Sequence, residues 1–99
     1  MAHILRFEGL PFRISDDDLF DWIEELTQIS PKEIYMISNR QGLASGDAYV
    51  VLDDKTMGKG VVEKCDEKTI RGSNRYVKIH ECAQDELDWQ LHRQSLYQG

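Results

Sequence analysis

The fold is decided by the stretch Ser45-Gly46-Asp47-Ala48-Tyr49-Val50-Val51-Leu52, in the middle of a chain of 99 residues. Side chains at alternate positions of a β-strand point to opposite faces of the sheet. The last six residues of the stretch therefore predict a strand with Ala48 and Val50 on one face and Tyr49 on the other. A strand with one apolar face needs neighbouring strands and a covering layer of helices.

Three further strands are predicted from similar patterns. Apolar residues alternate with charged ones over 4–8 and 76–80, and 34–37 is a short run of residues that favour strands. The polar, glycine-containing segment 38–46 is predicted to be the hairpin loop before the central strand.

The first helix is predicted directly after Ser15. Ser15 and Asp18 have the spacing of a capping box, and the acidic run at 16–18 suits the positive end of a helix dipole. Apolar residues then recur at helical spacing and are expected to form the buried stripe, namely Leu19, Phe20, Ile23 and Leu26.

A second helix is predicted after the aspartate pair at 53–54, which resembles an N-cap. Met57, Val61 and Cys65 follow at every fourth position. Two glycines inside this segment cost up to about 1 kcal/mol each, so the helix is expected to be weak.

The resulting order, βαββαβ, predicts the α+β ferredoxin-like fold, a four-stranded antiparallel sheet with both helices on one face. We expect one domain over residues 1–82. The tail, 83–99, is predicted to be helical because Leu87 and Leu91 share one helix face.

The formal net charge of -6 argues against nucleic acid at first, because phosphate contacts require cations. The predicted loops 9–14, 38–46 and 68–76, however, hold five basic residues and no acidic one. Half of the 18 acidic residues lie in the first helix and the tail. This distribution favours local, salt-sensitive binding of a short single strand over general affinity for duplex. With no apolar run of membrane length and no signal peptide pattern, the chain is expected to be intracellular.

Metal and catalytic sites are not favoured by the residues. Capping explains the aspartates at 16–18, and His3, His80 and Cys82 lack a fourth ligand or a recognised spacing. Met57-Gly58-Lys59-Gly60 lacks the frame of a phosphate loop. We expect neither a cofactor nor enzymatic activity.

Three short motifs resemble those of a known family. Gly9-Leu10-Pro11-Phe12, Ser45-Gly46-Asp47-Ala48-Tyr49-Val50 and Arg75-Tyr76-Val77 occur in the order and spacing found in quasi-RNA-recognition motifs of the heterogeneous nuclear ribonucleoprotein F and H type. The resemblance covers residues 4–81, so the predicted domain resembles an RNA recognition motif (RRM).

The resemblance implies binding of single-stranded, guanine-rich or purine-rich RNA through loops. In that family an aromatic residue, an arginine and a tyrosine enclose a guanine, and the matching residues in this sequence are Phe12, Arg75 and Tyr76. With neighbouring basic residues and a tyrosine on the open sheet face, the candidate RNA-binding residues are Phe12, Arg13, Arg40, Arg71, Arg75, Tyr76 and Tyr49. The tail is the alternative partner for Tyr49. Glu8 stands where the subfamily usually has a basic residue.

The resemblance also implies a role in RNA processing or splicing regulation, with the nucleus as the expected compartment and the cytoplasm as the alternative. Single-stranded RNA is the expected partner and other RNA-processing proteins are expected further partners. We expect no membrane association and no small-molecule substrate.

Two other functions fit the same fold. The first is a protein-interaction module that does not bind RNA through its sheet, as in the U2AF homology motifs, but the R-x-F of that family is missing at Arg71 and Arg75. The second is an acylphosphatase-type enzyme, whose phosphate-cradling loop is disfavoured because Pro11 removes a backbone donor.

Overall fold

The computed structural model describes residues 2–98. Four strands form one antiparallel sheet in the order β2-β3-β1-β4, and three helices cover it. This confirms the predicted ferredoxin-like fold. In chain order the elements are β1 (His3–Glu8), α1 (Asp16–Thr27), β2 (Glu33–Ser38), β3 (Ala44–Leu52), α2 (Lys55–Cys65), β4 (Lys78–Cys82) and α3 (Gln84–Gln98).

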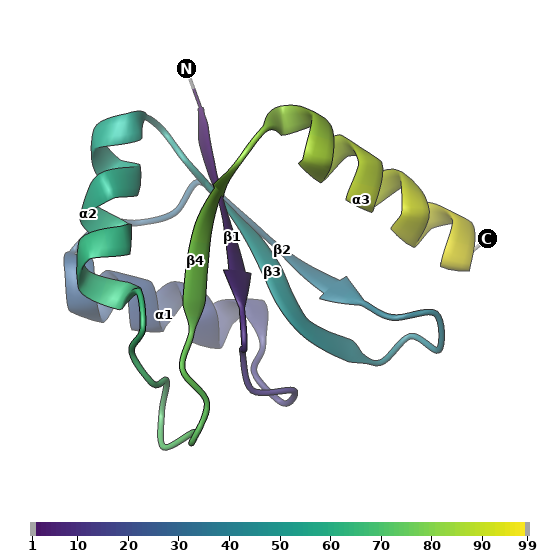
Figure 1. Cartoon of the computed structure of the whole chain (residues 1–99), viewed down its shortest axis with the longest axis horizontal. Helices are drawn as coiled ribbons and strands as arrows, with labels where there is room; N and C mark the ends of the chain where they lie inside the picture. The colour runs from purple at the N-terminus through teal and green to yellow at the C-terminus, as the bar shows by residue number, and fades with distance from the viewer. Residues whose placement is uncertain (1, 99) are drawn as a thin grey trace.

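The main core lies between the sheet and the helix pair α1 and α2, which lie together on one side of the sheet in Figure 1. Leu5 and Phe7 on β1 and Val50 on β3 are fully buried there, as the alternation predicts. β3 is a central strand, paired with β1 on one side and β2 on the other. Its residues from Ala48 to Leu52 are all buried, because both faces of this central strand are covered.

The start of α1 is held by the predicted capping box. The Ser15 hydroxyl accepts from the Asp18 backbone N–H at 3.1 Å, and the Asp18 carboxylate accepts from the Ser15 backbone N–H at 3.1 Å. The hydrogen bond from the Ser15 backbone N–H, followed by the contact of the Ser15 hydroxyl with the carboxylate, lowers the pKa of Asp18. At the start of α2, the Asp54 carboxylate accepts from the Met57 backbone N–H at 2.9 Å, which confirms the second predicted cap.

The glycine at position 58 has a packing role within α2. A Cβ atom at Gly58 would overlap Cδ2 of His3, so the imidazole ring occupies the space that a side chain would need. Close approach of β1 to α2 therefore offsets the poor helix propensity of this residue.

The buried face of α1 differs from the predicted stripe. Leu19 and Ile23 are buried as expected, but Trp22 is also buried, whereas Phe20 is half-buried and Leu26 is exposed. Phe20 lies about 100° around the helix from Leu19, which places it at the margin of the buried face.

A second, smaller core lies on the other face of the sheet, beneath α3. Leu87 of α3 is buried against Ile4, Ile37, Tyr49 and Val51 of the strands. Figure 1 shows α3 on the side of the sheet opposite α1 and α2. The C-terminal helix predicted from Leu87 is thus confirmed, and it closes a sheet face that would otherwise be open.

β3 begins three residues earlier than predicted. Ser38 pairs with Ala44 after an irregularity in the β2–β3 ladder, and the Ser45 hydroxyl donates to the Ile37 carbonyl at 2.8 Å. The loop therefore shrinks to 39–43. The hydrogen bond from the Ser45 side chain extends the pairing of β2 with β3 past the irregularity. The polar residues 44–46, whose sequence is typical of a loop, therefore belong to the strand.

β4 begins two residues later than predicted. Tyr76 forms an isolated bridge with Thr69, and the Val77 backbone N–H donates to the Lys68 carbonyl. Residues 76–77 therefore pair with residues 68–69, at the start of the loop between α2 and β4, and the chain enters the sheet only at Lys78.

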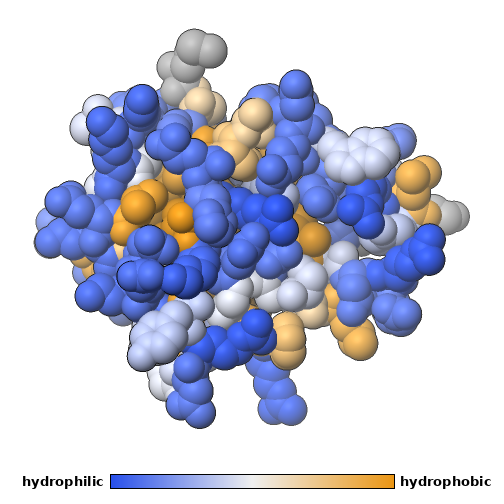
Figure 2. Space-filling model, viewed as in Figure 1, coloured by the Kyte–Doolittle hydropathy of each residue, from blue (hydrophilic) through white to orange (hydrophobic). Residues whose placement is uncertain are grey.

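Residues 2–98 include no helix that combines the length and the apolar character required to cross a membrane. The face seen in Figure 2 is mostly hydrophilic, and its hydrophobic patches are small and separate.

Candidate nucleic-acid interface

The loop after β1 and the loop before β4 lie next to each other at one end of the sheet in Figure 1, whereas the β2–β3 turn lies away from them, towards α3. Two backbone contacts hold the loop after β1 in place. The Leu10 N–H donates to the Gly46 carbonyl at 3.0 Å, which links the first loop to β3. A Cβ atom at Gly9, where φ is +79°, would lie 2.5 Å from the Tyr76 carbonyl oxygen, so only glycine permits this approach.

Phe12 and Arg75 form the centre of this end of the sheet. The Arg75 guanidinium carbon lies 4.8 Å from the centroid of the Phe12 ring. The side chains of Phe12 and Tyr76 are 59% and 64% exposed, respectively. We call Phe12, Arg75 and Tyr76 the loop site. Two exposed aromatic side chains and a guanidinium provide surfaces on which nucleobases stack.

The loop site rests on ordered backbone. Gly46 lies against Phe12, because a Cβ atom there would be 3.3 Å from Cε1 of the ring. In the loop before β4, the Arg75 N–H donates to the Ser73 hydroxyl at 3.0 Å, and Ile70 is fully buried. These contacts fix the backbone from which Phe12 and Arg75 extend.

Arg13 and Arg71 lie together beside the loop site. They line a shallow groove of about 350 Å³ between the loop after β1 and the loop before β4, together with Asp18. Arg71 also forms an ion pair with Glu25 of α1 at 3.4 Å. Arg71 is therefore partly neutralised, whereas Arg13 is exposed to solvent.

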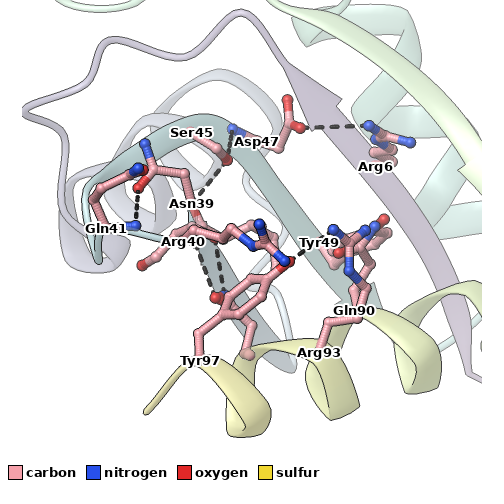
Figure 3. Close-up of a pocket in the computed structure, with 13 residues that line it drawn as sticks. Arg6, Asn39, Arg40, Gln41, Ser45, Asp47, Tyr49, Gln90, Arg93 and Tyr97 are labelled. Carbon is pink, nitrogen blue, oxygen red and sulfur yellow. Dashed lines mark hydrogen bonds and ion pairs between the residues drawn. The ribbon is translucent and has the colours of Figure 1, made fainter.

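Arg40 lies apart from the loop site, in the β2–β3 turn. The Asn39 side chain shapes this turn, because its carbonyl oxygen accepts from the N–H groups of Gln41 and Leu43 at 2.9 and 3.1 Å. Arg40 lines a pocket of about 560 Å³ between the turn and α3, shown in Figure 3. Of the predicted basic residues, Arg13, Arg71 and Arg75 thus lie at or beside the loop site, and Arg40 lies at the pocket next to α3.

Tyr49 is buried, so the expectation that it lies on an open sheet face is wrong. Its side chain is 1% exposed beneath α3, and its hydroxyl donates to the Glu86 carboxylate at 2.7 Å. Arg6 lies on the same face, 3.4 Å from Asp47 and 3.5 Å from Glu86. The tail helix, which was the alternative partner, occupies the surface that a base would need.

The charge of Glu8 is also compensated on this face. Its carboxylate lies 3.2 Å from the Arg6 guanidinium and 3.5 Å from Nε2 of His80. The acidic residue next to the first loop is therefore engaged by side chains of β1 and β4.

Burial, followed by the hydrogen bond to Glu86, raises the pKa of Tyr49 well above that of a free phenol. The unfolded chain releases this proton near pH 10, whereas the folded chain retains it. The stabilisation is complete below about pH 10 and is lost as the pH rises further. Between about pH 10 and 11, we expect wild type to lose about 1 kcal/mol of unfolding free energy relative to Tyr49→Phe. Urea unfolding of both proteins at several pH values measures this difference. If the unfolding free energies of wild type and Tyr49→Phe changed in parallel with pH, the raised pKa of Tyr49 would be contradicted.

Residues of α3 that face the pocket were missed by the sequence reasoning. Arg93 and Tyr97 both line it, and the Arg93 guanidinium donates to the Tyr97 hydroxyl at 2.7 Å. Gln90 and Gln94 lie on the same face. Their spacing at 90, 93, 94 and 97 is a helical repeat in the sequence, and it could have identified this face once the tail was predicted to be helical.

No group of three or more potential metal ligands occurs among residues 2–98. His3 lies 3.6 Å from Glu81. Burial raises the pKa of Cys65 to about 12 and that of Cys82 to about 11, so both thiols are protonated at neutral pH. Cys65 is buried and Cys82 is half-buried, and protonated thiols are poor nucleophiles.

Comparisons with known proteins agree with this geometry. A family model described as an RRM domain matches residues 5–96. Heterogeneous nuclear ribonucleoprotein F from Rattus norvegicus is 26% identical over 91 residues, which cover 91% of this chain and 21% of the relative. The Bos taurus protein is 26% identical over 89 residues, which cover 89% and 21%. The chain thus spans about a fifth of the length of these curated relatives.

Solved structures share the fold. The Glorund qRRM2 domain superposes with a TM-score of 0.74 at 19% identity, covering 91% of this chain and 99% of that one. Human G-rich RNA sequence binding factor 1 gives a TM-score of 0.72 at 18% identity, covering 99% and 97%. The resemblance to quasi-RNA-recognition motifs is therefore confirmed. Because the family model spans almost the whole described chain, including β1, the loops and most of α3, this chain belongs to the RNA recognition motif family.

Proposed function

We propose that this domain binds a short single strand of RNA at the loop site. The observation that carries the proposal is the Arg75 guanidinium 4.8 Å from the ring of an exposed Phe12, beside an exposed Tyr76. Membership of the RNA recognition motif family supports RNA as the ligand. The domain acts as a binding module and not as an enzyme.

Stacking would supply most of the affinity. A base on an aromatic side chain contributes about 1 to 3 kcal/mol, whichever base it is, and a guanidinium plane extends the stacking surface. The basic residues of the loops would attract the phosphates, which makes binding salt-dependent; they are Arg13, Arg40, Lys68, Arg71 and Arg75.

Guanine is the base that this site would prefer. Arginine is the side chain that pairs with O6 and N7 of guanine through two parallel N–H donors. Arg75 already stacks on Phe12, and Arg13 and Arg71 lie beside it as further donors. The name of the human structural neighbour, a G-rich RNA sequence binding factor, supports the same preference.

The wider role follows from the same relatives. Proteins named heterogeneous nuclear ribonucleoproteins support a part in nuclear RNA processing and splicing regulation, with other RNA-processing proteins as partners. We assign the domain to residues 1–82, with helix α3 of the tail packed on its sheet, and propose that further domains accompany it in the full protein.

A panel of short G-, U-, A- and C-rich RNAs at two salt concentrations tests the proposal. We expect the G-rich RNA to bind most tightly, by about tenfold, and its affinity to fall as salt is raised. Fluorescence anisotropy with labelled RNAs measures both effects. Equal, weak binding of all four RNAs would contradict base recognition, and binding to none at low salt would contradict RNA as the ligand.

A further inference from the structure

The pocket between α3 and the β2–β3 turn, which we call the α3 pocket, lies outside the loop site. Its volume of about 560 Å³ is within the range of small-ligand sites, and polar side chains provide most of its lining. Three arginines line it, and Asp47 is the one acidic residue of the lining. Such a concentration of cations is unusual in a chain with a net charge of -6.

Two of these arginines are available to a ligand. Arg6 is engaged by carboxylates on the sheet, one of which is Asp47 at 3.4 Å. Arg40 and Arg93 have no carboxylate within ion-pair distance among residues 2–98. They belong to the turn and to α3, which face each other across the pocket in Figure 3.

The α3 pocket holds an arginine and an aromatic ring, as the loop site does, in a different arrangement. The Arg93 guanidinium donates to the Tyr97 hydroxyl at 2.7 Å and its carbon lies 5.8 Å from the ring centroid, whereas the Arg75 carbon lies 4.8 Å from the centroid of Phe12. Gln90 and the other amide side chains of the lining add hydrogen-bond donors and acceptors suited to base edges. An arginine, an aromatic ring and amides together fit one nucleotide with its phosphate.

The two sites are separated by a single strand. Gly46 contacts Phe12, while its neighbours Ser45 and Asp47 line the α3 pocket. Adjacent residues of a strand face opposite sides of the sheet. The loop site therefore lies on one side of β3 at residues 45–47, and the α3 pocket lies on the other side. An RNA strand that crosses the loop end of the sheet therefore reaches both.

We infer that the α3 pocket is a second RNA subsite, which holds a nucleotide of the strand whose guanine lies at the loop site, with Arg40 and Arg93 on its phosphates. This inference rests on the proposed function. It assigns a binding role to α3 in addition to its coverage of Tyr49.

Two G-rich RNAs test the inference, one of about 4 nucleotides and one of about 10, so that the shorter fills the loop site alone. We expect Arg93→Gln and Arg40→Gln each to weaken binding of the longer RNA about 3- to 10-fold, to lower its salt dependence by about one phosphate contact, and to leave the shorter RNA unaffected. Lys59→Gln is the matched control, because it removes one positive charge from an exposed position of α2.

Amide shifts of the unmodified protein provide a second readout, which does not depend on the packing of the variants. The longer RNA should shift the amides of Arg40, Gln90 and Tyr97, and the shorter RNA should not. The inference would be overturned if both arginine variants matched Lys59→Gln, or if an acidic peptide shifted these amides and RNA did not. Loss of binding in Arg75→Ala alongside such a result would leave the proposed function intact.

Discussion

Arg75→Ala should lower the affinity for a G-rich RNA about 10- to 100-fold while the protein remains folded. The side chain loses both its stacking surface beside Phe12 and its paired donors to a guanine edge, each worth about 1 to 3 kcal/mol. The cost to stability is small, because an exposed cation–π contact contributes about 0.5 to 1 kcal/mol. Anisotropy titration and thermal unfolding measure the two effects separately.

Three further variants separate the contributions at this site. Phe12→Ala should weaken all four RNAs of the panel to a similar extent, because stacking tolerates any base. Arg75→Lys keeps the charge but loses the planar fork, so we expect it to retain salt-dependent affinity and lose the preference for guanine. Lys59→Ala serves as a control for the removal of a charge elsewhere on the surface. Full affinity in Arg75→Ala would show that the loop site is not the point of contact.

Gly9→Ala should have the largest effect on stability, about 3 kcal/mol or more. A left-handed backbone costs a residue with a Cβ atom about 1 to 2 kcal/mol. At Gly9 the added carbon would also lie 2.5 Å from the Tyr76 carbonyl oxygen, and relief of such overpacking typically costs a further 1 to 3 kcal/mol, as an order of magnitude. Urea unfolding gives the change in unfolding free energy.

The matched control is Gly42→Ala. Gly42 has the same φ of +79°, but apart from its chain neighbours no residue comes within 4 Å of the position that an added methyl group would take. The substitution therefore introduces the backbone strain without the clash. We expect a loss of about 1 kcal/mol for this variant. Similar losses at both positions would show that the contact between the first loop and Tyr76 is not tight. Separation of these loops should also reduce RNA binding by Gly9→Ala at temperatures where it is folded.

The elements that sequence patterns predicted well are those fixed by local chemistry. The capping box of Ser15 and Asp18 places the start of α1, and the alternation around Val50 identifies the central strand. Phe12 and Arg75, far apart in the chain, were paired only through the resemblance to a family. In the folded chain they lie within stacking distance.

The contacts that could not be predicted are those between distant elements. The tail was predicted to be a helix from Leu87 and Leu91, but a helical pattern does not specify which surface it covers. Its packing over Tyr49 depends on the second apolar face of the sheet, where Ile4 and Val51 alternate with residues of the main core. The α3 pocket, formed where the tail meets the β2–β3 turn, was missed for the same reason.

The most direct test of loop binding is an amide chemical-shift titration of the full chain with a short G-rich RNA. We expect the large shifts to occur around Phe12, Arg75 and Tyr76, while the sheet amides near Tyr49 change little because α3 remains in place. Large shifts centred on Tyr49 and Arg6, with the loop amides unaffected, would contradict loop binding.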